Sequence, residues 1–451
     1  MDYFNYFSYD WFSHTQIKIR GTNLNIFLNK KILIYGLGKS GLSAFWFLRN
    51  KGDIFLFDDN QFKKTPEIKK NLISYKNILK SRFDQIVVSP GIDINKCKLS
   101  KFLKKNYNKI YSDLDVFFSF YKNDCITITG TNGKSTTSQL LYKVLANKKF
   151  DVKLVGNIGK PILSVKNVKK KTIFVIEASS YQLEYSQLFT SKYAAILNLS
   201  PDHIDRHKTL NNYLKAKFKL LKNQLKGSFA FVKKDDPLIN KELKSRKFKI
   251  KIIRVNTKNI NNILKDINNE YFNTETNKEN LSFVLEISKK FDIQDNLIKK
   301  TIKKFNGLKY RQQIIFKRKN LTIINDSKST SFSSSIGLLK SNHKIYWLLG
   351  GLYKKGDKFE LSKKYFSNIR AFIYGNEKNF FNKNLKGKIV YKNFNNLNNA
   401  LKKIFTIIRK EKFLNKTILF SPCAASFDSF KNFEDRGSYF NKLVKKYSNG
   451  L

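Results

Sequence analysis

The segment best suited to chemistry is a glycine-rich run, GTNGKST, at residues 130–136. Glycines allow backbone N–H groups to surround phosphates, and Lys134 can reach the terminal phosphates. A hydroxyl group, from Ser135 or Thr136, can hold Mg²⁺. The strict phosphate-loop pattern begins with a glycine, and Ile128 occupies that position here. The run therefore predicts an ATP-using enzyme whose loop departs from the strict pattern.

A second glycine-rich run, GLGKSG at residues 36–41, follows a strand-like stretch and begins a helix-like one. Asp58 and Asp59 end the next strand-like stretch, where a dinucleotide-binding fold carries the acid that contacts a ribose. The pattern alone suggests NAD, but it also occurs in parallel sheets that bind other nucleotides or none. It indicates a nucleotide-type ligand without identifying it.

Acidic residues and histidines follow the later strand-like stretches. Glu177 stands where a carboxylate near the phosphate loop could complete a Mg²⁺ shell. The run DHIDRH at residues 202–207 holds two aspartates and two histidines, which is typical of a metal site, although isolated histidines are more often structural. Lys217 lies fourteen residues after His203. In so lysine-rich a chain, a solvated helix face is the alternative to a catalytic role.

The formal net charge is +53, from 87 Lys and Arg against 34 Asp and Glu. Such a field could bind nucleic acid. However, the lysines are spread along the whole chain, and the aromatic–basic repeats of single-strand binders are absent from the sequence. Compositional drift towards residues with A- and T-rich codons is therefore favoured, and no specific nucleic-acid partner is expected. The field would still help to collect anionic substrates.

Composition bounds the class of protein. With 451 residues, 41% of them hydrophobic, the chain should form about three globular domains. Its three cysteines are far apart, which excludes a disulfide framework or a CxxC metal knuckle and favours a reducing compartment. No apolar run approaches the roughly 18 residues needed to span a bilayer, and a secretory signal pattern is absent from the N-terminal residues. We expect a cytoplasmic protein.

Short β-branched and aromatic runs alternate with longer amphipathic stretches along the chain, which predicts an α/β fold with parallel sheets. The expected strands are residues 31–35, 53–57, 85–89, 109–111, 125–129, 172–177, 193–197, 228–233, 321–325, 345–349, 371–374, 388–391 and 417–420. Ligands of such sheets bind beyond the carboxyl ends of the strands. We expect an N-terminal extension at 1–22 and domains at 23–122, 123–308 and 309–451.

The order of these segments resembles the Mur ligase family. The ATP loop is followed by GNIG at 156–159, EASSYQLE at 177–184, DHIDR at 202–206 and YLKAK at 213–217. Mur ligases are ATP-dependent amide ligases of peptidoglycan precursor synthesis, related to folylpolyglutamate synthetase. The resemblance implies a Rossmann-like N-terminal domain without NAD, a central P-loop ATPase-like domain with a mostly parallel sheet, and a Rossmann-like C-terminal domain.

The C-terminal third distinguishes among members of this family. NDSKSTS at 325–331 and SPCAASFDSFKNFEDRG at 421–437 are similar to the branch that adds D-glutamate. The arginine-bearing loop of the branch that adds diaminopimelate or lysine is absent from the sequence. The resemblance implies transfer of D-glutamate to UDP-N-acetylmuramoyl-L-alanine through an acyl phosphate, with release of ADP and phosphate. It also favours a monomer.

The resemblance further implies a role for each motif residue. The catalytic residues would be Lys134, Glu177, His203 and Lys217. The residues that contact ATP would be Gly130, Thr131, Asn132, Gly133, Lys134, Ser135, Thr136, Asn280, Arg311 and Asp326. The UDP-substrate would contact Lys39, Ser40, Asp58, Gly91, Asn157 and His203. D-glutamate would contact Thr330, Ser426, Phe433 and either Lys354 or Lys355. Two Mg²⁺ sites would use Ser135, Glu177, His203 and Lys217, the last as its carbamate, N6-carboxylysine.

Three features depart from the family pattern. The chain is one residue short between Asp205 and Tyr213, and Thr276 stands where the family usually has histidine. The loop after Gly351 is one residue longer than in the family pattern, so either Lys354 or Lys355 could be the lysine that contacts D-glutamate. Three other interpretations also stay open: a Mur ligase for another amino acid, an ATP-dependent nucleic-acid protein, and an NAD dehydrogenase.

Overall fold

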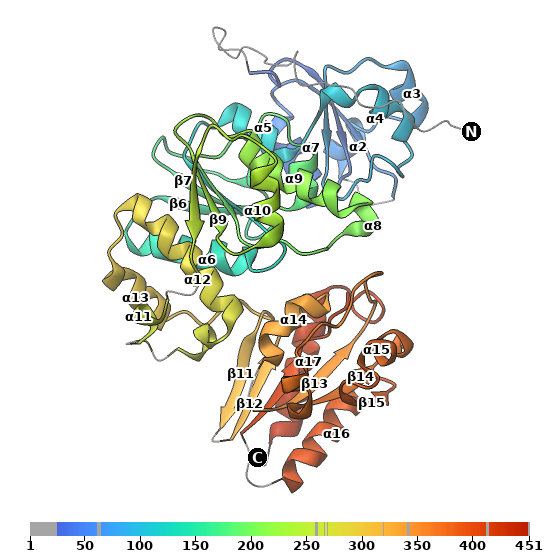
Figure 1. The fold of residues 1–451 in the computed structure, drawn as a ribbon. Coiled ribbons are helices and arrows are strands. Elements are labelled where there is room, and N and C mark those ends of the chain that lie inside the picture. Colours follow the sequence, from blue (N-terminus) through green and yellow to red (C-terminus); the bar gives the residue numbers. More distant parts are fainter. Residues whose placement is uncertain are drawn as a thin grey trace, which may run out of the picture. The chain divides into compact units, whose positions relative to one another are not determined.

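The computed structural model describes residues 25–60, 65–257, 260–265, 267, 269–318, 320–340, 343–411 and 415–449. The expected extension at residues 1–22 lies outside the described residues. The chain forms two compact units, Met1–Lys122 and Asn123–Leu451. Their described parts contain one four-stranded and two six-stranded sheets, covered by helices (Figure 1). The α/β class predicted from the sequence is confirmed.

The first unit contains a parallel sheet in the order β2-β1-β3-β4. Its elements are β1 (Lys31–Tyr35), α1 (Lys39–Leu48), β2 (Asp53–Phe57), α2 (Pro66–Lys70), α3 (Tyr75–Lys80), β3 (Gln85–Val88), α4 (Ser100–Lys105), η1 (Tyr107–Lys109), β4 (Ile110–Tyr111) and α5 (Asp113–Phe120). The chain passes from β2, on one side of β1, to β3 on the other. Ligands bind beyond the carboxyl ends of strands at such a switch point, which is where the run 36–41 follows β1.

The second unit begins with a parallel sheet in the order β10-β9-β8-β5-β7-β6. Its strands are β5 (Cys125–Thr129), β6 (Val152–Gly156), β7 (Ile173–Glu177), β8 (Tyr193–Ile196), β9 (Phe229–Lys233) and β10 (Lys251–Val255). The helices are α6 (Lys134–Asn147), η2 (Ile162–Ser164), α7 (Ser180–Tyr185), α8 (Ile204–His207), α9 (Leu210–Lys222), α10 (Pro237–Lys244), α11 (Asn261–Leu264), η3 (Glu270–Asn273), α12 (Glu275–Ser288), η4 (Lys289–Phe291) and α13 (Asp295–Lys303). Because β5 lies between β7 and β8, the loops that follow these three strands meet at one edge.

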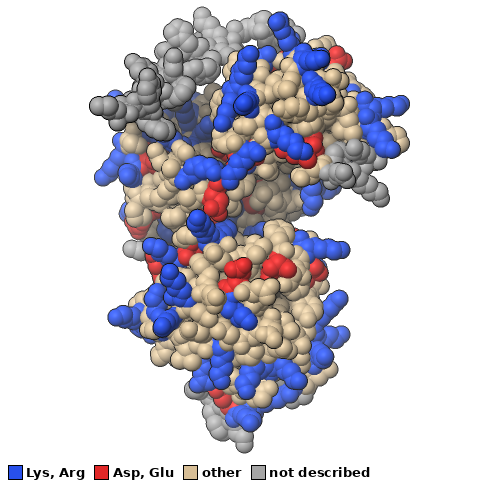
Figure 2. Space-filling model, turned by 90° about the vertical axis from the view of Figure 1, so that its right-hand side faces the viewer, with Lys and Arg blue, Asp and Glu red and all other residues tan. Residues whose placement is uncertain are grey.

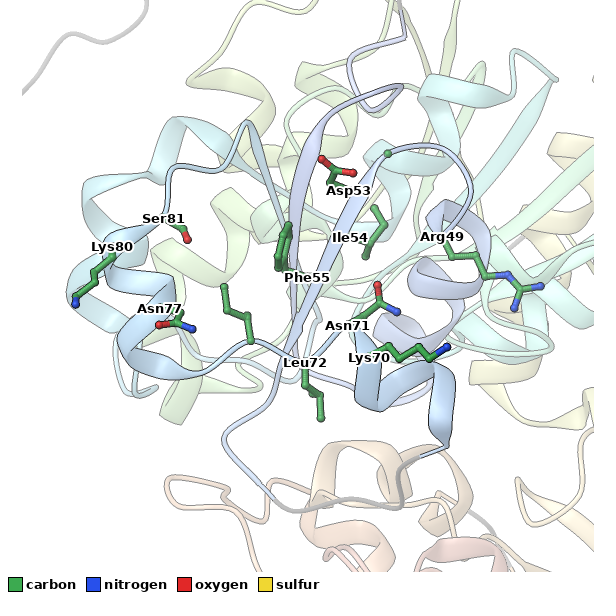
Figure 3. A pocket seen from close by; sticks show the side chains of 12 residues that line it. Arg49, Asp53, Ile54, Phe55, Lys70, Asn71, Leu72, Asn77, Lys80 and Ser81 are labelled. Carbon is green, nitrogen blue, oxygen red and sulfur yellow. The ribbon is translucent and has the colours of Figure 1, made fainter.

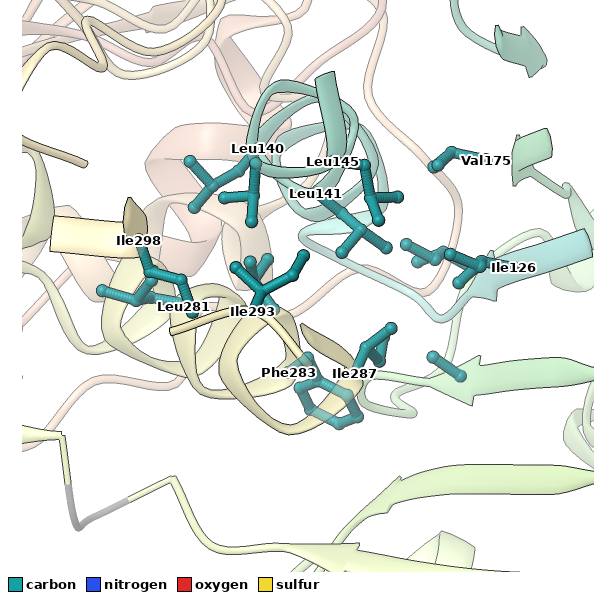
Figure 4. Packing of buried hydrophobic residues seen from close by; sticks show 14 of the residues in the cluster. Ile126, Leu140, Leu141, Leu145, Val175, Leu281, Phe283, Ile287, Ile293 and Ile298 are labelled. Atoms are coloured by element: carbon teal, nitrogen blue, oxygen red, sulfur yellow. The ribbon is translucent and has the colours of Figure 1, made fainter. Parts of the chain in front are cut away.

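Apolar side chains of α6, α12 and α13 cover one face of this sheet (Figure 4). Leu141 and Leu145 of α6 are completely buried, as is Ile287 of α12. Beneath them, Ile126 of β5 and Val175 of β7 supply the surface of the sheet. This layer holds the helix that begins at Lys134 against the strand that precedes the glycine loop.

The second unit continues with a mixed sheet in the order β11-β12-β16-β13-β14-β15, in which only the β11–β12 pair is antiparallel among the described strands. Its elements are β11 (Gln313–Arg318), β12 (Leu321–Asn325), α14 (Phe332–Leu339), β13 (Lys344–Gly350), η5 (Lys363–Asn368), β14 (Ile369–Tyr374), α15 (Lys378–Leu385), β15 (Val390–Phe394), α16 (Leu397–Lys410), β16 (Lys416–Phe420) and α17 (Phe433–Ser448). Alternate residues of β13 pack under α16 and α17 on one face and under α14 and α15 on the other.

Three strands were not predicted from the sequence: β6, β10 and β11. Each lies at the edge of its sheet. Edge strands are partly exposed, and β10 (KIIRV) and β11 (QIIFKR) carry basic residues at exposed positions. Such sequences lack the continuous apolar run that marks a buried parallel strand. The strand predicted at residues 388–391 is also shifted, since β15 covers Val390–Phe394.

Basic side chains are scattered over the face shown in Figure 2, without a single stripe or arm. This distribution agrees with compositional drift better than with a dedicated nucleic-acid groove. Among the described residues, none of the helices is both long and apolar enough to cross a membrane.

The core of the second unit yields a stability prediction. Leu141→Ala removes a completely buried side chain between α6 and the sheet, and we expect a loss of about 2–5 kcal/mol in the free energy of unfolding. Leu225→Ala is the matched control, because Leu225 is 62% exposed, and its effect should stay within about 0.5 kcal/mol. Urea-induced unfolding measures both. Equal effects of the two substitutions would contradict this packing.

Candidate active site

The glycine loop at 130–133 joins β5 to α6 at the carboxyl edge of the central sheet. Gly133 has φ +82°, a left-handed conformation that favours glycine. A Cβ atom on Gly133 would lie 2.0 Å from Oδ1 of Asn280, which belongs to α12. Only glycine therefore lets α12 approach the loop so closely.

Lys134 is held at the centre of this loop. Its Nζ donates hydrogen bonds to the carbonyl oxygens of Gly130 and Thr131, at 2.9 and 2.8 Å. Burial lowers the pKa of Lys134, while Glu177 and Asp202 act in the opposite direction. The loop thus presents an ammonium group at the place where a phosphate-binding loop needs one.

Asn198, in the segment after β8, anchors the loop. Its side-chain oxygen accepts a hydrogen bond from the backbone N–H of Asn132 at 2.9 Å, and its carbonyl accepts one from Thr131. Its amide donates to Oε1 of Glu279 at 2.7 Å, and Oε2 of Glu279 pairs with Lys233. Asn198 and Glu279 could not be recognised from the sequence, because their contact joins the segment after β8 to α12 over 81 residues.

Glu177, the last residue of β7, is almost completely buried. Its Oε1 accepts a hydrogen bond from the Asn157 amide at 2.7 Å, but its Oε2 has no hydrogen-bond partner among the described residues. A buried carboxylate oxygen left unpaired costs free energy, so it is suited to a cation. Ser135, whose hydroxyl could complete such a site, is also buried, at the start of α6.

Lys217 lies on the inward face of α9 and is 1% exposed. Its Nζ donates to the carbonyl oxygen of Gly130 at 2.8 Å and lies 4.7 Å from the centre of the Tyr213 ring. Burial, and then the charge of Lys134, lower the pKa of Lys217 well below its usual range. The alternative of a solvated helix face is therefore wrong for this lysine.

His203 lies beside a carboxylate and a phenol. Its Nδ1 is 2.8 Å from the Tyr181 hydroxyl, and its Nε2 is 3.3 Å from Oδ2 of Asp202. Burial lowers the pKa of His203 to about 4, so its imidazole is neutral near pH 7. A neutral imidazole has a lone pair that can bind a metal ion. Oδ1 of Asp202 accepts from Nζ of Lys354 at 2.6 Å, which brings the loop after β13 to this point.

The described residues contain no cluster of three or more His, Cys, Asp or Glu placed to hold a metal ion. A magnesium site here would therefore depend on Ser135, on the unpaired oxygen of Glu177, and on ligands from a modified lysine, phosphate or water. Mg²⁺ is commonly bound by one or two carboxylates together with substrate phosphates and water. The donor set fits that ion.

The residues expected near the adenosine end come from two parts of the second unit. Asn280 is buried on α12, and its Oδ1 accepts from the Thr137 hydroxyl at 3.3 Å. Asp326, directly after β12, accepts from the backbone of Gln312 and from the Ser421 hydroxyl. Arg311 is close enough to contribute to the lowered pKa of Lys134.

The residues expected to hold D-glutamate follow strands of the C-terminal sheet. Ser426 is buried, Thr330 and Phe433 are half-buried, and the carbonyl of Phe433 accepts from the Ser327 hydroxyl at 2.9 Å. The two candidate lysines differ: Lys354 reaches Asp202, whereas Lys355 is exposed.

Two further cations, Arg436 and Lys328, lie among these loops and were not predicted as site residues from the sequence. Arg436 is 1% exposed and donates to the carbonyls of Ser327, Ala424 and Ala425, which ties together the loops after β12 and β16. Lys328 lies 4.1 Å from the ring centre of Phe433, and its pKa falls to about 8, first through burial. Lys328 lies within the motif at residues 325–331, and this position could have identified it as a site residue from the sequence.

A chain of buried hydroxyls starts at Asp326. Ser421 donates to Asp326 at 2.9 Å, and its oxygen lies 2.5 Å from that of Ser335. The hydroxyl oxygen of Ser329 lies 2.8 Å from that of Ser335 and 2.8 Å from that of the half-buried Ser334. The chain thereby links the carboxylate expected near ATP to the segment that carries Thr330.

In the first unit, the candidate residues surround the carboxyl end of β1. Lys39 and Ser40 are the first two residues of α1, and Oδ2 of Asp58 accepts from the backbone N–H of Leu37 at 2.5 Å. A Cβ atom on Gly41 would lie only 1.8 Å from the carbonyl oxygen of Gly36, so this helix starts unusually close to its loop. Gly91 has open space where a side chain would stand.

A cavity of about 690 Å³ also lies in this unit (Figure 3). Gly52 and Asp53 line it at the amino end of β2, together with Arg49, Lys70 and Asn77. It is therefore not at the carboxyl edge, where parallel sheets bind their ligands.

A glycine loop on a parallel sheet, followed by a lysine that donates back to the loop and flanked by a buried glutamate at the end of the neighbouring strand, defines the class of P-loop-like nucleotide-binding α/β proteins. Two family models match the chain: "Mur ligase middle domain" over residues 128–302 and "Mur ligase MurD-like, N-terminal domain" over residues 30–110.

Curated relatives match almost the whole chain. UDP-N-acetylmuramoylalanine–D-glutamate ligase of Rickettsia felis is 33% identical over 94% of this chain and 99% of the relative. The ligase of the same name from Buchnera aphidicola subsp. Schizaphis graminum is 36% identical over 93% of this chain and 99% of the relative. The chain belongs to the Mur ligase family.

Solved structures agree in fold. The MurF ligase of Thermotoga maritima, in complex with ADP, has a TM-score of 0.56 at 13% identity and covers 94% of this chain and 97% of its own. UDP-N-acetylmuramate–alanine ligase MurC of the same organism has a TM-score of 0.53 at 16% identity, covering 94% and 100%. The three-domain Mur ligase architecture predicted from the sequence is confirmed at the level of fold.

Asp326 should make stability depend on pH. Burial raises the pKa of Asp326 to about 7. The hydrogen bonds from Ser421 and Gln312 and the charges of Arg311 and Arg436 lower this pKa, but their effect is smaller than that of burial. Between about pH 4 and pH 7 the unfolded chain therefore loses a proton that the folded chain keeps, so stability falls as pH rises. Asp326→Asn cannot ionise, and its amide can donate to Ser421.

We therefore expect Asp326→Asn to melt at a higher temperature than the unsubstituted protein at about pH 8, and the difference to shrink at about pH 5. Thermal unfolding at the two pH values is the measurement. A difference that stays constant with pH would show that Asp326 is ionised throughout this range.

Proposed function

We propose that the protein ligates D-glutamate to UDP-N-acetylmuramoyl-L-alanine with consumption of ATP, a step of peptidoglycan precursor synthesis. The observation that carries the proposal is the group of Lys134, Glu177 and Lys217 at one edge of the central sheet, in which Glu177 and Lys217 are buried. The names of relatives that match the chain from end to end support the same reaction.

The reaction has two chemical steps. The substrate carboxylate attacks the γ-phosphorus of ATP, the bond to the β–γ bridging oxygen breaks, and ADP leaves. The amine of D-glutamate, having lost a proton to solvent, then adds to the acyl carbon and displaces phosphate. Lys134 stabilises the negative charge that is carried by the transferring phosphoryl group. The remaining loop residues supply backbone N–H groups to the phosphates, and Asn280, Arg311 and Asp326 hold the adenosine end.

Glu177, Ser135 and His203 would hold two Mg²⁺ ions together with modified Lys217. Bound Mg²⁺ would neutralise the triphosphate and bring the two anionic reactants together. Asn157 orients Glu177 through its hydrogen bond to Oε1, which leaves Oε2 available to the ion. Asn157 thus contributes by orienting the carboxylate of Glu177, and Glu177 contributes its negative charge.

Lys217 must change its charge to serve as a ligand, because an ammonium group repels a cation and has no lone pair. Its lowered pKa favours the neutral amine. That amine can add to CO₂, forming an N–C bond and releasing one proton, to give an anionic carbamate. Carbamate oxygens are ligands of the kind that Mg²⁺ prefers.

Two further groups of residues are proposed to bind the two substrates. Lys39, Ser40, Asp58 and Gly91 are proposed for the uridine-nucleotide end. Thr330, Ser426, the Phe433 backbone and Lys354 are proposed for D-glutamate, with Lys354 preferred over Lys355 because only Lys354 reaches Asp202.

Cys97, Cys125 and Cys423 are free thiols, which is consistent with a cytoplasmic location.

We expect the protein to be a monomer. We also retain the domain divisions near residues 122 and 308 as a proposal.

The acceptor amino acid can be tested directly. Phosphate release from ATP and Mg²⁺ is measured with UDP-N-acetylmuramoyl-L-alanine and, separately, D-Glu, L-Glu, L-Ala, L-Lys or meso-diaminopimelate. We expect turnover with D-Glu alone, and a loss of about 10³-fold or more in Lys134→Ala, since that residue contacts the transferring group. Turnover with another amino acid would keep the reaction class and overturn the acceptor. If none of them is used, a nucleic-acid filter assay becomes the next measurement.

The carbamate is tested by equilibrating the protein with ¹³CO₂ and recording its ¹³C NMR spectrum. We expect one carbamate resonance that is absent from Lys217→Ala. Lys215→Ala is the matched control, because Lys215 lies on the same helix with its side chain exposed. Retention of the resonance in Lys217→Ala would place the modification elsewhere.

A further inference from the structure

The cavity at the amino end of β2, in the first unit, has no role in the proposed reaction. It has a volume of about 690 Å³, and residues on both faces of the sheet line it (Figure 3). Arg49 and Ile54 lie on one side of β2, whereas Phe55 and Lys80 lie on the other (Figure 3). The cavity therefore surrounds the outer edge of this strand and does not lie under one face of the sheet.

β2 is an edge strand whose outer backbone groups are only partly paired. Its neighbour among the described strands is β1, on its inner side. On the outer side, the N–H of Leu56 donates to the carbonyl of Asn71 at 2.8 Å, and the carbonyl of Leu56 accepts from Ile73 at 3.1 Å. Backbone groups repeat their direction every second residue along a strand, so those of Ile54 also face outward. They face the cavity, without a backbone partner among the described residues.

The sequence of β2 differs from those of the edge strands β10, β11 and β15, which carry exposed basic residues. β2 reads DIFLF, and its one charged residue is Asp53 at the amino end. An apolar edge strand with free backbone groups can accept an extended segment of another chain as a further strand.

The charged side chains around this edge are mainly cationic. Arg49, Lys70 and Lys80 line the cavity and are exposed, and Asp53 is the one acidic residue among those that line it. A segment with acidic side chains could therefore pair with these cations while its backbone pairs with β2. A second copy of this chain, with its formal net charge of +53, would instead bring like charges together.

We propose that the open edge of β2 is a docking site for an acidic segment of a partner protein, which adds to the sheet as an extra strand. The N–H and C=O of Ile54 would bond to the backbone of this segment, while its acidic side chains would meet Arg49 on one face and Lys80 on the other. Backbone bonds supply affinity in such complexes, and side-chain contacts supply specificity. Because Asp58 follows the opposite end of β2, this site is separate from the one proposed for the UDP-substrate.

The probe is a fluorescently labelled, capped peptide of alternating glutamate and valine residues. Fluorescence anisotropy measures its binding to the full-length protein, and mass spectrometry measures deuterium exchange of the Ile54 amide. We expect saturable binding that slows this exchange. The same peptide with N-methylated backbone amides keeps its charge but loses strand hydrogen bonds, so it should bind about tenfold more weakly. A lysine–valine peptide should not bind.

The double variant Lys70→Glu/Lys80→Glu reverses two of the cations that line the cavity, and we expect it to bind the glutamate–valine peptide about tenfold more weakly. Lys104→Glu/Lys105→Glu is the matched control. Both of these lysines are exposed on α4, outside the cavity, and the change in net charge is the same. Binding to the control should stay within about twofold of that to the unsubstituted protein, because salt screens distant charges.

Equal binding of the N-methylated and unmodified peptides would overturn the proposal, since charge alone would then explain binding. Equal weakening in the two double variants would overturn it too, because the overall charge of the chain would then attract the peptide. So would an absence of binding at about 1 mM peptide. If pyrophosphate slows exchange of the Ile54 amide as the peptide does, the cavity is a small-anion site. If exchange slows with protein concentration alone, the edge binds a second copy. Either result would contradict an acidic partner.

Discussion

The placement of two lysine side chains against one glycine loop is the constraint on which the centre of this protein depends. Lys217 is buried and Lys134 is half-buried at one edge of the central sheet, and the charge of Lys134 lowers the pKa of Lys217. Carbonyl oxygens of the glycine loop accept hydrogen bonds from both lysines, and the carboxylates of Glu177 and Asp202 offset the charge of Lys134. A centre built in this way attracts phosphates and carboxylates, which are the reacting groups of an ATP-dependent ligase. The surrounding packing keeps the two lysines at that edge.

The sheets and their loops could be predicted because parallel strands bury both faces and leave a strong sequence signal. Local sequence could not distinguish Lys215 from Lys217, which lie two residues apart on one helix. The first is exposed and the second is buried against Gly130, 87 residues earlier in the chain. The prediction that Lys217 is a site residue came only from its place in the ordered motifs of the Mur ligase family. A lysine's role here is decided by tertiary contact rather than by its neighbours in sequence.

The supporting residues were the least predictable part of the site. Asn198 and Glu279 hold the glycine loop through contacts between distant segments. The Nη atoms of Arg436 donate to three backbone carbonyls, a group that every residue carries, so nothing in the sequence pointed to its partners. Such residues hold the loops of the site in place and do not themselves contact the reacting groups. Their side chains are ordinary polar ones, and nothing in their spacing sets them apart from the many other Asn and Lys residues.

The basic residues on the edge strands have a consequence for solubility. An exposed edge strand offers unpaired backbone groups to which a second chain can add. Lys251 and Arg254 are exposed on β10, as are Lys317 and Arg318 on β11 and Lys392 on β15. Two copies that met along these edges would bring like charges together. Drift towards lysine, which looks costly for a folded chain, thus also protects it against aggregation through its sheets.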